Sequence, residues 1–155
     1  MDFALPFDFL YQGSLIQNIA FTSSGYIMLE AAPGQFSATF NQTINNAAYW
    51  GLFPFWEALE ADFGNQYYQT TGTAPNQKFI VQWDEIHNGE DNQDCAIEGY
   101  ECITETFQLV LYDPNYYSTT TGDGEIKFQY KEIHDIDNGD YDLRWGNYST
   151  IGIES

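Results

Sequence analysis

The sequence contains very few basic residues. Only four of its 155 residues are Lys or Arg, whereas 23 are Asp or Glu, and the formal net charge is −19. Nucleic-acid binding depends on cationic side chains that displace counterions from phosphates, so this composition excludes it. Attraction to an anionic membrane surface is excluded for the same reason. No apolar run approaches the roughly 20 residues of a membrane-spanning helix, so we expect no membrane insertion.

Cysteine and histidine are equally scarce. The two cysteines, Cys95 and Cys102, bound the segment C-A-I-E-G-Y-E-C, whose spacing does not fit C-x-x-C zinc or redox motifs. They either close a small disulfide loop or remain two free thiols. We expect the disulfide, because the segment is polar and exposed thiols survive poorly outside the cell. His87 and His134 have no second His or Cys at ligand spacing, so we expect no zinc and place both at the surface or at strand ends.

Signatures of catalysis are missing as well. The sequence has no G-x-S-x-G elbow and no glycine-rich phosphate loop, and its two histidines leave little room for a nucleophilic triad. Pairs of carboxylates for glycoside hydrolysis could be drawn from the many acids, but nothing singles one pair out. We therefore expect a protein that is not an enzyme.

Aromatic residues and short alternating segments dominate what is present. Aromatics make up 18% of the chain, enough to build a hydrophobic core despite the charge. Residues 78–86, 104–112 and 125–131 alternate between apolar and polar side chains, which is typical of antiparallel strands with one buried face. Turn signals separate about ten such strands. The sequence predicts an all-β fold, an antiparallel β-sandwich or jelly-roll-like domain, as a single domain over residues 1–155.

Other segments carry weaker signals. Residues 49–55 are intensely apolar, and residues 56–62 are the one stretch where helical spacing is arguable. Trp50, Trp56 and Trp83 lie in apolar patterns and are expected in the core. The last predicted strand, residues 148–153, has no closing segment after it and would leave an open sheet edge, which invites pairing with another chain.

An acidic loop near the C-terminus is a candidate calcium site. Its oxygen-bearing residues are Asp135, Asp137, Asn138, Asp140 and Asp142, arranged around an Asn-Gly turn. Calcium takes six to eight oxygen ligands from such loops, although this is not an EF-hand. The alternative is a solvated acidic hairpin turn. The high net negative charge favours calcium as a bound ion, because without a cation these aspartates would repel each other.

Several aromatic residues are candidates for ligand binding. These residues are Trp145, Tyr116, Tyr117, Tyr67 and Tyr68. Exposed rings are typical of glycan-binding modules, since sugar faces stack on them. Tyr116 and Tyr117 lie in a long connection between predicted strands, where binding residues are often placed. Packing within the domain is the alternative for each of them.

The chain also resembles a known class of module. The similarity rests on sequence motifs of strands and turns, which are spread over most of the chain: Leu5–Phe9, Ser23–Ile27, Leu52–Trp56, Phe79–Trp83, Thr106–Pro114, Thr121–Lys131 and Gly146–Glu154. These segments resemble a β-sandwich module appended to large secreted or surface-anchored bacterial proteins, such as adhesins and secreted peptidases, with features of the nidogen-type extracellular domain. Two positions depart from the pattern: Ser24 replaces the usual Asn, and Glu57-Ala58 replaces two acids.

This resemblance implies location and architecture more than activity. We expect a non-catalytic extracellular or cell-surface module, excised from a larger protein, stabilised by calcium and mediating adhesion or binding of a glycan or surface protein. The alternative is a structural spacer, or a subunit that self-associates through an open sheet edge. Neighbouring domains of the same chain are further expected partners.

Overall fold

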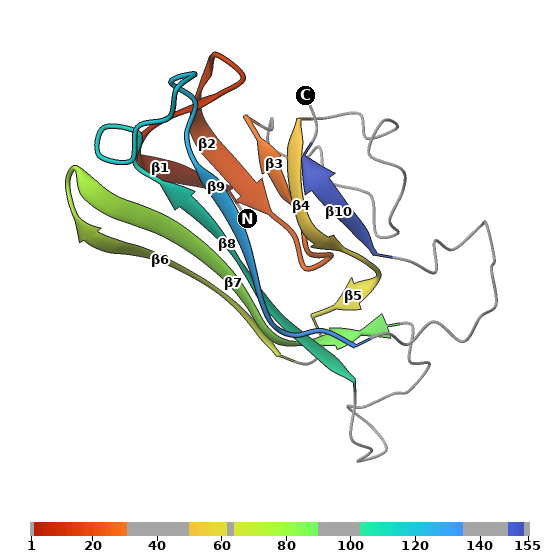
Figure 1. The fold of residues 1–155 in the computed structure, drawn as a ribbon. Helices are drawn as coiled ribbons and strands as arrows, with labels where there is room; N and C mark the ends of the chain where they lie inside the picture. Colours follow the sequence, from red (N-terminus) through yellow and green to blue (C-terminus); the bar gives the residue numbers. More distant parts are fainter. Residues whose placement is uncertain (1, 31–49, 62–63, 90–102, 135–148, 154–155) are drawn as a thin grey trace.

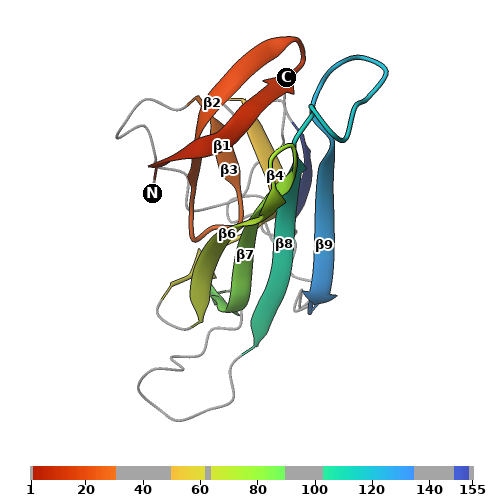
Figure 2. The same ribbon diagram turned by 90° about the vertical axis from the view of Figure 1, so that its left-hand side faces the viewer.

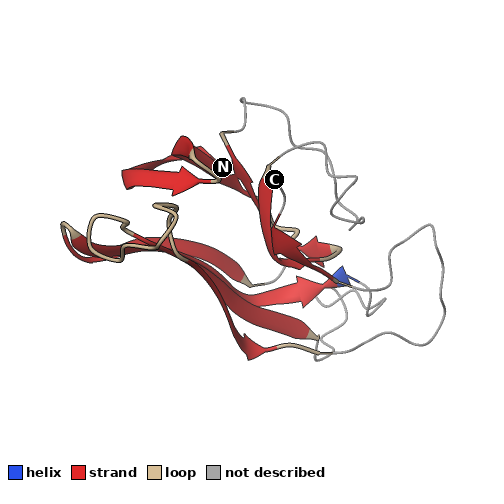
Figure 3. Ribbon diagram, turned by 45° about the horizontal axis from the view of Figure 1, so that its top comes forward, coloured by secondary structure: helices blue, strands red, loops and turns tan. Residues whose placement is uncertain are grey.

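The computed structural model describes residues 2–30, 50–61, 64–89, 103–134 and 149–153. Apart from a 3₁₀ residue at Gly89, this part of the chain contains strands, turns and loops (Figure 1 and Figure 3). Its ten strands are β1 (Asp2–Tyr11), β2 (Ser14–Phe21), β3 (Ile27–Leu29), β4 (Gly51–Trp56), β5 (Leu59–Glu60), β6 (Asn65–Thr73), β7 (Asn76–Asn88), β8 (Thr104–Tyr112), β9 (Ile126–Glu132) and β10 (Thr150–Ile153). The predicted all-β fold is confirmed.

The strands form two antiparallel sheets, each with five strands in the described ranges. Sheet A has the order β1-β2-β3-β4-β10. In sheet B the order is β5-β7-β8-β9, and β6 also pairs with β7. Figure 2 shows β6 to β9 running side by side, and Figure 3 shows the two sheets as separate layers. Among the described strands, the last one, β10, lies at the end of sheet A; the predicted open edge there stays a prediction.

One hydrophobic core fills the space between the sheets. Trp83 on β7 and Phe107 on β8 are stacked with their ring centroids 4.8 Å apart. Phe21 of sheet A meets the Trp83 ring edge-on at 6.2 Å. The indole N–H of Trp83 donates a hydrogen bond of 2.8 Å to the carbonyl of Thr22. Trp83 therefore joins the two sheets both by packing and by a hydrogen bond.

A bulge in β7 changes which residues face the core. The register with β8 shifts between Trp83 and Ile86, and Glu85 has a positive φ of 52°. The hydroxyl of Thr106 accepts a hydrogen bond of 3.0 Å from the Glu85 N–H. An extra residue in one strand reverses the alternation beyond it. Trp83 and Ile86 are consequently both buried, although simple alternation would place them on opposite faces.

Strand β4 is buried on both faces, which explains its unbroken apolar sequence. Leu52 and Phe55 belong to the main core. Phe53 and Trp56 instead stack on each other, with ring centroids 5.0 Å apart. The arguable helical spacing over residues 56–62 does not produce a helix in its described part, where β4 ends and β5 follows after a short turn. Burial on both faces outweighs the local helical spacing there.

The three tryptophans of these strands differ in burial. Trp56 and Trp83 are buried, as predicted. Trp50 is 41% exposed, so its placement in the core was wrong. It lies just outside β4, where its ring contacts Tyr11 at a centroid distance of 6.4 Å. Trp50 therefore lies one residue before the strand in which the rest of the described apolar run is buried.

A proline in β4 provides a second link between the sheets. Pro54 has no N–H to donate to a neighbouring strand. The register between β4 and β10 shifts at this point, which accommodates the missing donor. The carbonyl of Pro54 accepts a hydrogen bond of 2.6 Å from the hydroxyl of Tyr130 on β9. Strand β4 of sheet A and the edge strand β9 of sheet B are thus tied together at this end of the sandwich.

Candidate functional site

The tyrosines Tyr67 and Tyr68 face opposite sides of sheet B. The Tyr68 ring lies 4.0 Å from the ring of Phe3 and 6.0 Å from that of Phe79, between the two sheets. Successive residues of a strand point to opposite faces, so Tyr67 points to the outer face. Both side chains are half exposed, Tyr67 at 51% and Tyr68 at 50%, but only Tyr67 presents its ring on the outer face.

Tyr67 begins a row of polar side chains that crosses the sheet. The strand register pairs Tyr67 with Gln82, Gln82 with Gln108, and Gln108 with Gln129. Paired residues of antiparallel strands share one face. Accordingly, Nε2 of Gln108 donates a hydrogen bond of 2.6 Å to Oε1 of Gln82, and Nε2 of Gln82 donates one of 2.9 Å to Oδ1 of Asp84. The row offers amide donors and acceptors next to an aromatic ring.

A cluster of tyrosines around Lys78 lies further along the same face. Nζ of Lys78 is 4.8 Å from the ring centre of Tyr112 and 5.5 Å from that of Tyr117. The Tyr117 hydroxyl donates a hydrogen bond of 2.7 Å to Oδ1 of Asn76. Tyr116 packs edge-on against Tyr117 at 4.9 Å and remains 56% exposed. The predicted pair in the long connection is therefore held against the end of sheet B.

We call this surface the glutamine–tyrosine face. It is made of Tyr67, Gln69, Lys78, Gln82, Gln108, Tyr112, Lys127 and Gln129, with Tyr116 and Tyr117 at one end. Because strands rise about 3.3 Å per residue, the Lys78 and Gln82 rows are roughly 13 Å apart. Tyr67 and the glutamine amides form one end and the tyrosine cluster the other, and the row between them holds Gln69, Ile80, Val110 and Lys127. Rings at both ends with polar groups beside them are suited to an extended, polar ligand.

The distribution of charge also distinguishes this sheet. Within the described residues all three cations, Lys78, Lys127 and Lys131, lie on β7 and β9. The chain as a whole carries a formal charge of −19. Lys78 and Lys127, which lie on the glutamine–tyrosine face, therefore make the negative potential weaker there, which favours a neutral or weakly anionic ligand.

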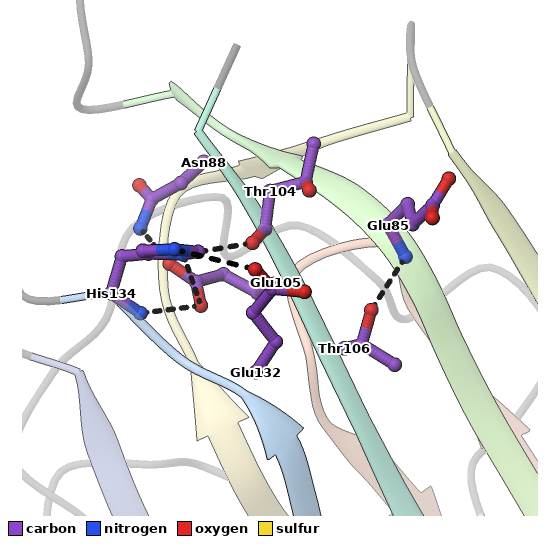
Figure 4. A network of polar contacts seen from close by, with 7 residues as sticks. All are labelled: Glu85, Asn88, Thr104, Glu105, Thr106, Glu132 and His134. Atoms are coloured by element: carbon purple, nitrogen blue, oxygen red, sulfur yellow. Dashed lines mark hydrogen bonds and ion pairs between the residues drawn. The ribbon is translucent and has the colours of Figure 1, made fainter.

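A second polar cluster lies where β7 ends and β8 begins, and Figure 4 shows it. The side chain of Glu105 is buried, with 0% exposure. Its Oε1 accepts a hydrogen bond of 3.1 Å from Nδ2 of Asn88, and its Oε2 accepts one of 2.9 Å from the backbone N–H of His134. Burial raises the pKa of the Glu105 carboxyl, although the Asn88 hydrogen bond opposes this shift.

The two histidines have different surroundings. In His134, Nδ1 lies 3.0 Å from the carbonyl oxygen of Thr104, and Nε2 lies 3.6 Å from a carboxylate oxygen of Glu132. His87 is 2% exposed, with Nδ1 3.9 Å from Glu60. The sequence placed both at the surface or at strand ends. His87 does lie near the end of β7, but it is buried. Beyond the bulge it lies on the opposite face from Ile86, in register with Glu60 of β5 and Thr104 of β8.

The Glu105 cluster holds the ends of three strands together. It connects the ends of β7, β8 and β9 through one buried carboxylate. In the parts of the chain that the structure describes, no group of three or more His, Cys, Asp or Glu side chains is arranged to hold a metal ion. The Glu105 carboxylate contacts the side-chain amide of Asn88, the backbone N–H of His134 and the imidazole of His134.

Changing Glu105 to Gln should alter how stability depends on pH. The folded-state pKa is raised above its ordinary value of 4.5, so the folded chain holds this proton more tightly than the unfolded chain. The corresponding stabilisation is complete below the unfolded pKa and is lost as pH rises through the folded pKa. We therefore expect the stability of Glu105→Gln relative to the unmodified protein to increase from acid to neutral pH, measured by urea unfolding.

High salt supplies the control for this experiment. Repulsion among exposed carboxylates also weakens the protein as pH rises, but salt screens that repulsion. The cost of burying Glu105 is a loss of solvation and is screened much less. The difference between the two proteins should therefore keep its pH dependence in concentrated salt. A difference that stays constant with pH would show that Glu105 does not ionise at a cost in the folded state.

Several predicted site residues lie outside the described part of the chain. They are the calcium candidates Asp135, Asp137, Asn138, Asp140 and Asp142, the aromatic Trp145, and the cysteines Cys95 and Cys102. Calcium binding and the disulfide therefore stay predictions. The last described residue before the acidic loop is His134, whose backbone is held by Glu105.

Some residues of the glutamine–tyrosine face were not singled out by the sequence. The row formed by Gln82, Gln108 and Gln129 was visible only as polar positions of three alternating segments. Lys78 was counted as one of the few cations, without a role. These residues are brought together by the register between neighbouring strands. The alternation within a single strand does not reveal that register.

These features define an all-β sandwich module with an exposed polar and aromatic sheet face. The chain belongs to the NIDO-related family, whose family model matches residues 1–155. Membership of this nidogen-related family points to an extracellular module and to a role without catalysis. Neither the curated proteins nor the solved structures contain a match to the chain. In the described ranges no helix has the length and apolar character needed to cross a membrane.

Proposed function

We propose that this chain is a non-catalytic extracellular binding module and that it binds carbohydrate through the glutamine–tyrosine face. The observation that carries the proposal is the row from Tyr67 through Gln82 and Gln108 to Gln129. A ring for stacking stands beside amides that can both donate and accept hydrogen bonds. The separation of Tyr67 from the Tyr116 and Lys78 end favours an extended chain of sugars over a single small molecule.

The electrostatics support the same class of ligand. Glycans without strong charge do not depend on the cationic patch that nucleic acids require. Lys78 and Lys127 reduce the negative potential locally, which favours approach of a neutral or weakly acidic glycan. Adhesion or targeting of a larger secreted protein would follow from such binding. Calcium, if it binds the acidic loop over residues 135–142, would stabilise the domain by mass action.

Affinity electrophoresis in gels that contain neutral or acidic polysaccharides tests the proposal. The strong negative charge moves the protein quickly in a native gel, so retardation is easy to measure. We expect one or more polysaccharides to retard the protein. Tyr67→Ala should weaken that retardation about tenfold, in line with the loss of a central tyrosine from an interface. Tyr116→Ala should weaken it as well.

Two variants make the test specific. Tyr67→Phe retains the ring and should retain most of the binding. Ile151→Ala removes an exposed apolar side chain of sheet A and should leave binding unchanged. The positions Tyr67, Tyr116 and Ile151 are all exposed, so the folded state should survive, which the melting temperature checks. Equal retardation of all variants, or none with any polysaccharide, would contradict carbohydrate binding at this face.

A structural or self-associating role is the alternative. It is favoured by exposed edge strands, among them β10 with the exposed side chains Ile151 and Ile153. Strand pairing at such an edge and ligand binding on a sheet face use different surfaces, so the two roles are separable by mutation.

A further inference from the structure

The described part of the sandwich has four lateral edges, and edges are where β-proteins associate. Sheet A ends in β1 and β10; sheet B ends in β9 on one side and, on the other, in β6 together with the two-residue β5, both of which pair with β7. An edge strand presents unpaired N–H and C=O groups to other chains. Natural proteins protect such edges with charges, prolines, bulges or very short strands.

Three of the four edges carry this protection. Strand β1 contains Pro6 and Asp8, and its register shifts between Ala4 and Phe9. Strand β9 carries two lysines and ends in a glutamate. Strand β10 has only four residues. Each of these devices discourages pairing with a second chain.

Strand β6 has none of these devices. It runs over nine residues, Asn65–Thr73, and pairs with β7 in an unshifted register throughout. None of its residues is charged, and none is proline. The uncharged stretch extends from Gly64 to Gln77, in a chain with 23 acidic residues. Among the described strands β6 pairs with β7 only, and none of them pairs with its other side.

We propose that β6 is a self-association edge, which pairs antiparallel with β6 of a second copy of this chain. Two copies with a formal charge of −19 each repel one another over most of their surface. A close contact between them is favoured where no charge is present, and β6 is the long edge that meets this condition. An antiparallel strand paired with itself gives a two-fold interface, the commonest arrangement in oligomers.

The side chains of β6 suit such pairing. Tyrosine and threonine are favoured in strands, and aromatic–threonine neighbours across a pair are stabilising. Tyr67, Gln69 and Thr71 point to the outer face, as the register with Gln82, Ile80 and Lys78 requires. Pairing through β6 would join two glutamine–tyrosine faces into one continuous surface. A long ligand could then contact both copies at once, which raises its apparent affinity.

Sedimentation velocity of the whole chain over a range of concentrations tests this proposal. We expect a monomer–dimer equilibrium that strengthens when salt is added, because salt screens the repulsion between copies. Gln69→Lys places a charge at the middle of the β6 edge and should weaken dimerisation about tenfold or more. Gln69 is exposed, so the melting temperature should confirm that the variant folds.

Two further variants locate the contact. Thr120→Lys adds the same charge at an exposed loop position and should leave the dimer intact. Ile151→Lys changes the β10 edge and should also leave it intact. A strict monomer at all concentrations and salt levels would overturn the proposal. A dimer that resists Gln69→Lys, or that is lost only with Ile151→Lys, would overturn it equally, since the contact would then lie elsewhere.

Discussion

Replacing Trp83 with alanine is expected to lower the free energy of unfolding by about 3–5 kcal/mol, the usual cost of removing a large aromatic side chain from a core. The side chain is 0% exposed and stacks on Phe107. Its indole N–H also donates to the carbonyl of Thr22 in the opposite layer. The change therefore removes packing, leaves a cavity and breaks a link between the sheets. Urea unfolding followed by circular dichroism measures the loss.

Trp50 provides a matched control for this prediction. It is the same residue type, but it is 41% exposed and contacts the ring of Tyr11 with a centroid distance of 6.4 Å. Trp50→Ala should cost no more than about 1 kcal/mol, as is usual for partly exposed positions. Because natural domains have only about 5–15 kcal/mol of stability, Trp83→Ala should also reduce the folded fraction on heating. Equal losses for both variants would contradict the placement of Trp83 at the centre of the core.

Replacing Gly25 with alanine should be nearly as damaging, for a different reason. Gly25 has φ = +76°, and a Cβ built there would lie 1.9 Å from the carbonyl oxygen of Phe55. The carbonyl of Gly25 also accepts a hydrogen bond of 3.3 Å from the Phe55 N–H, so the two segments cannot separate freely. We expect about 1–2 kcal/mol from the left-handed backbone, and about 1–3 kcal/mol more from overpacking. Thermal and urea unfolding measure the total.

Gly13 separates the two contributions. It has almost the same φ, +75°, but nothing lies within 4 Å of its Cβ position. Gly13→Ala should therefore cost only the backbone term, about 1–2 kcal/mol. The difference between the two variants measures the steric contact between the turn at Gly25 and strand β4. If both variants lost the same stability, that close contact would not exist in the folded protein.

Much of the fold could be predicted because several strands show a local alternation of apolar and polar residues. The alternation over residues 78–86 and 104–112 corresponds to β7 and β8, the long strands of sheet B. Strand β4 was harder, because burial on both faces removes alternation and leaves only an apolar run. The bulge at Glu85 could not be predicted either, since it is stabilised by the Thr106 hydroxyl on another strand.

The candidate site was predictable only in part. Tyr67 and Tyr116 were named from their residue type and position, and both are exposed. Which of Tyr67 and Tyr68 faces outward depends on the register between β6 and β7 and on the contact with Phe3. That contact joins β1 and β6, which are far apart in the sequence, so no local sequence pattern predicts it.

Long-range polar contacts were the least predictable feature. Glu105 looks like any other acid in a strand rich in threonine, yet it is buried and bonded to Asn88 and His134. Such a carboxylate is recognised only when the ends of three strands are brought together. The high negative charge does not predict a buried carboxylate either, because most acidic side chains are expected to be exposed to solvent.

Chemical-shift mapping of the ¹⁵N-labelled protein with an oligosaccharide from the most strongly retarding polysaccharide tests the central claim most directly. Binding at the glutamine–tyrosine face predicts that the largest changes occur at Tyr67, Gln82, Gln108 and Gln129, and that they extend to Lys78. Sheet A should show little change. Changes concentrated on sheet A or around Glu105, or no change at saturating oligosaccharide, would contradict the assignment of this face as the binding surface.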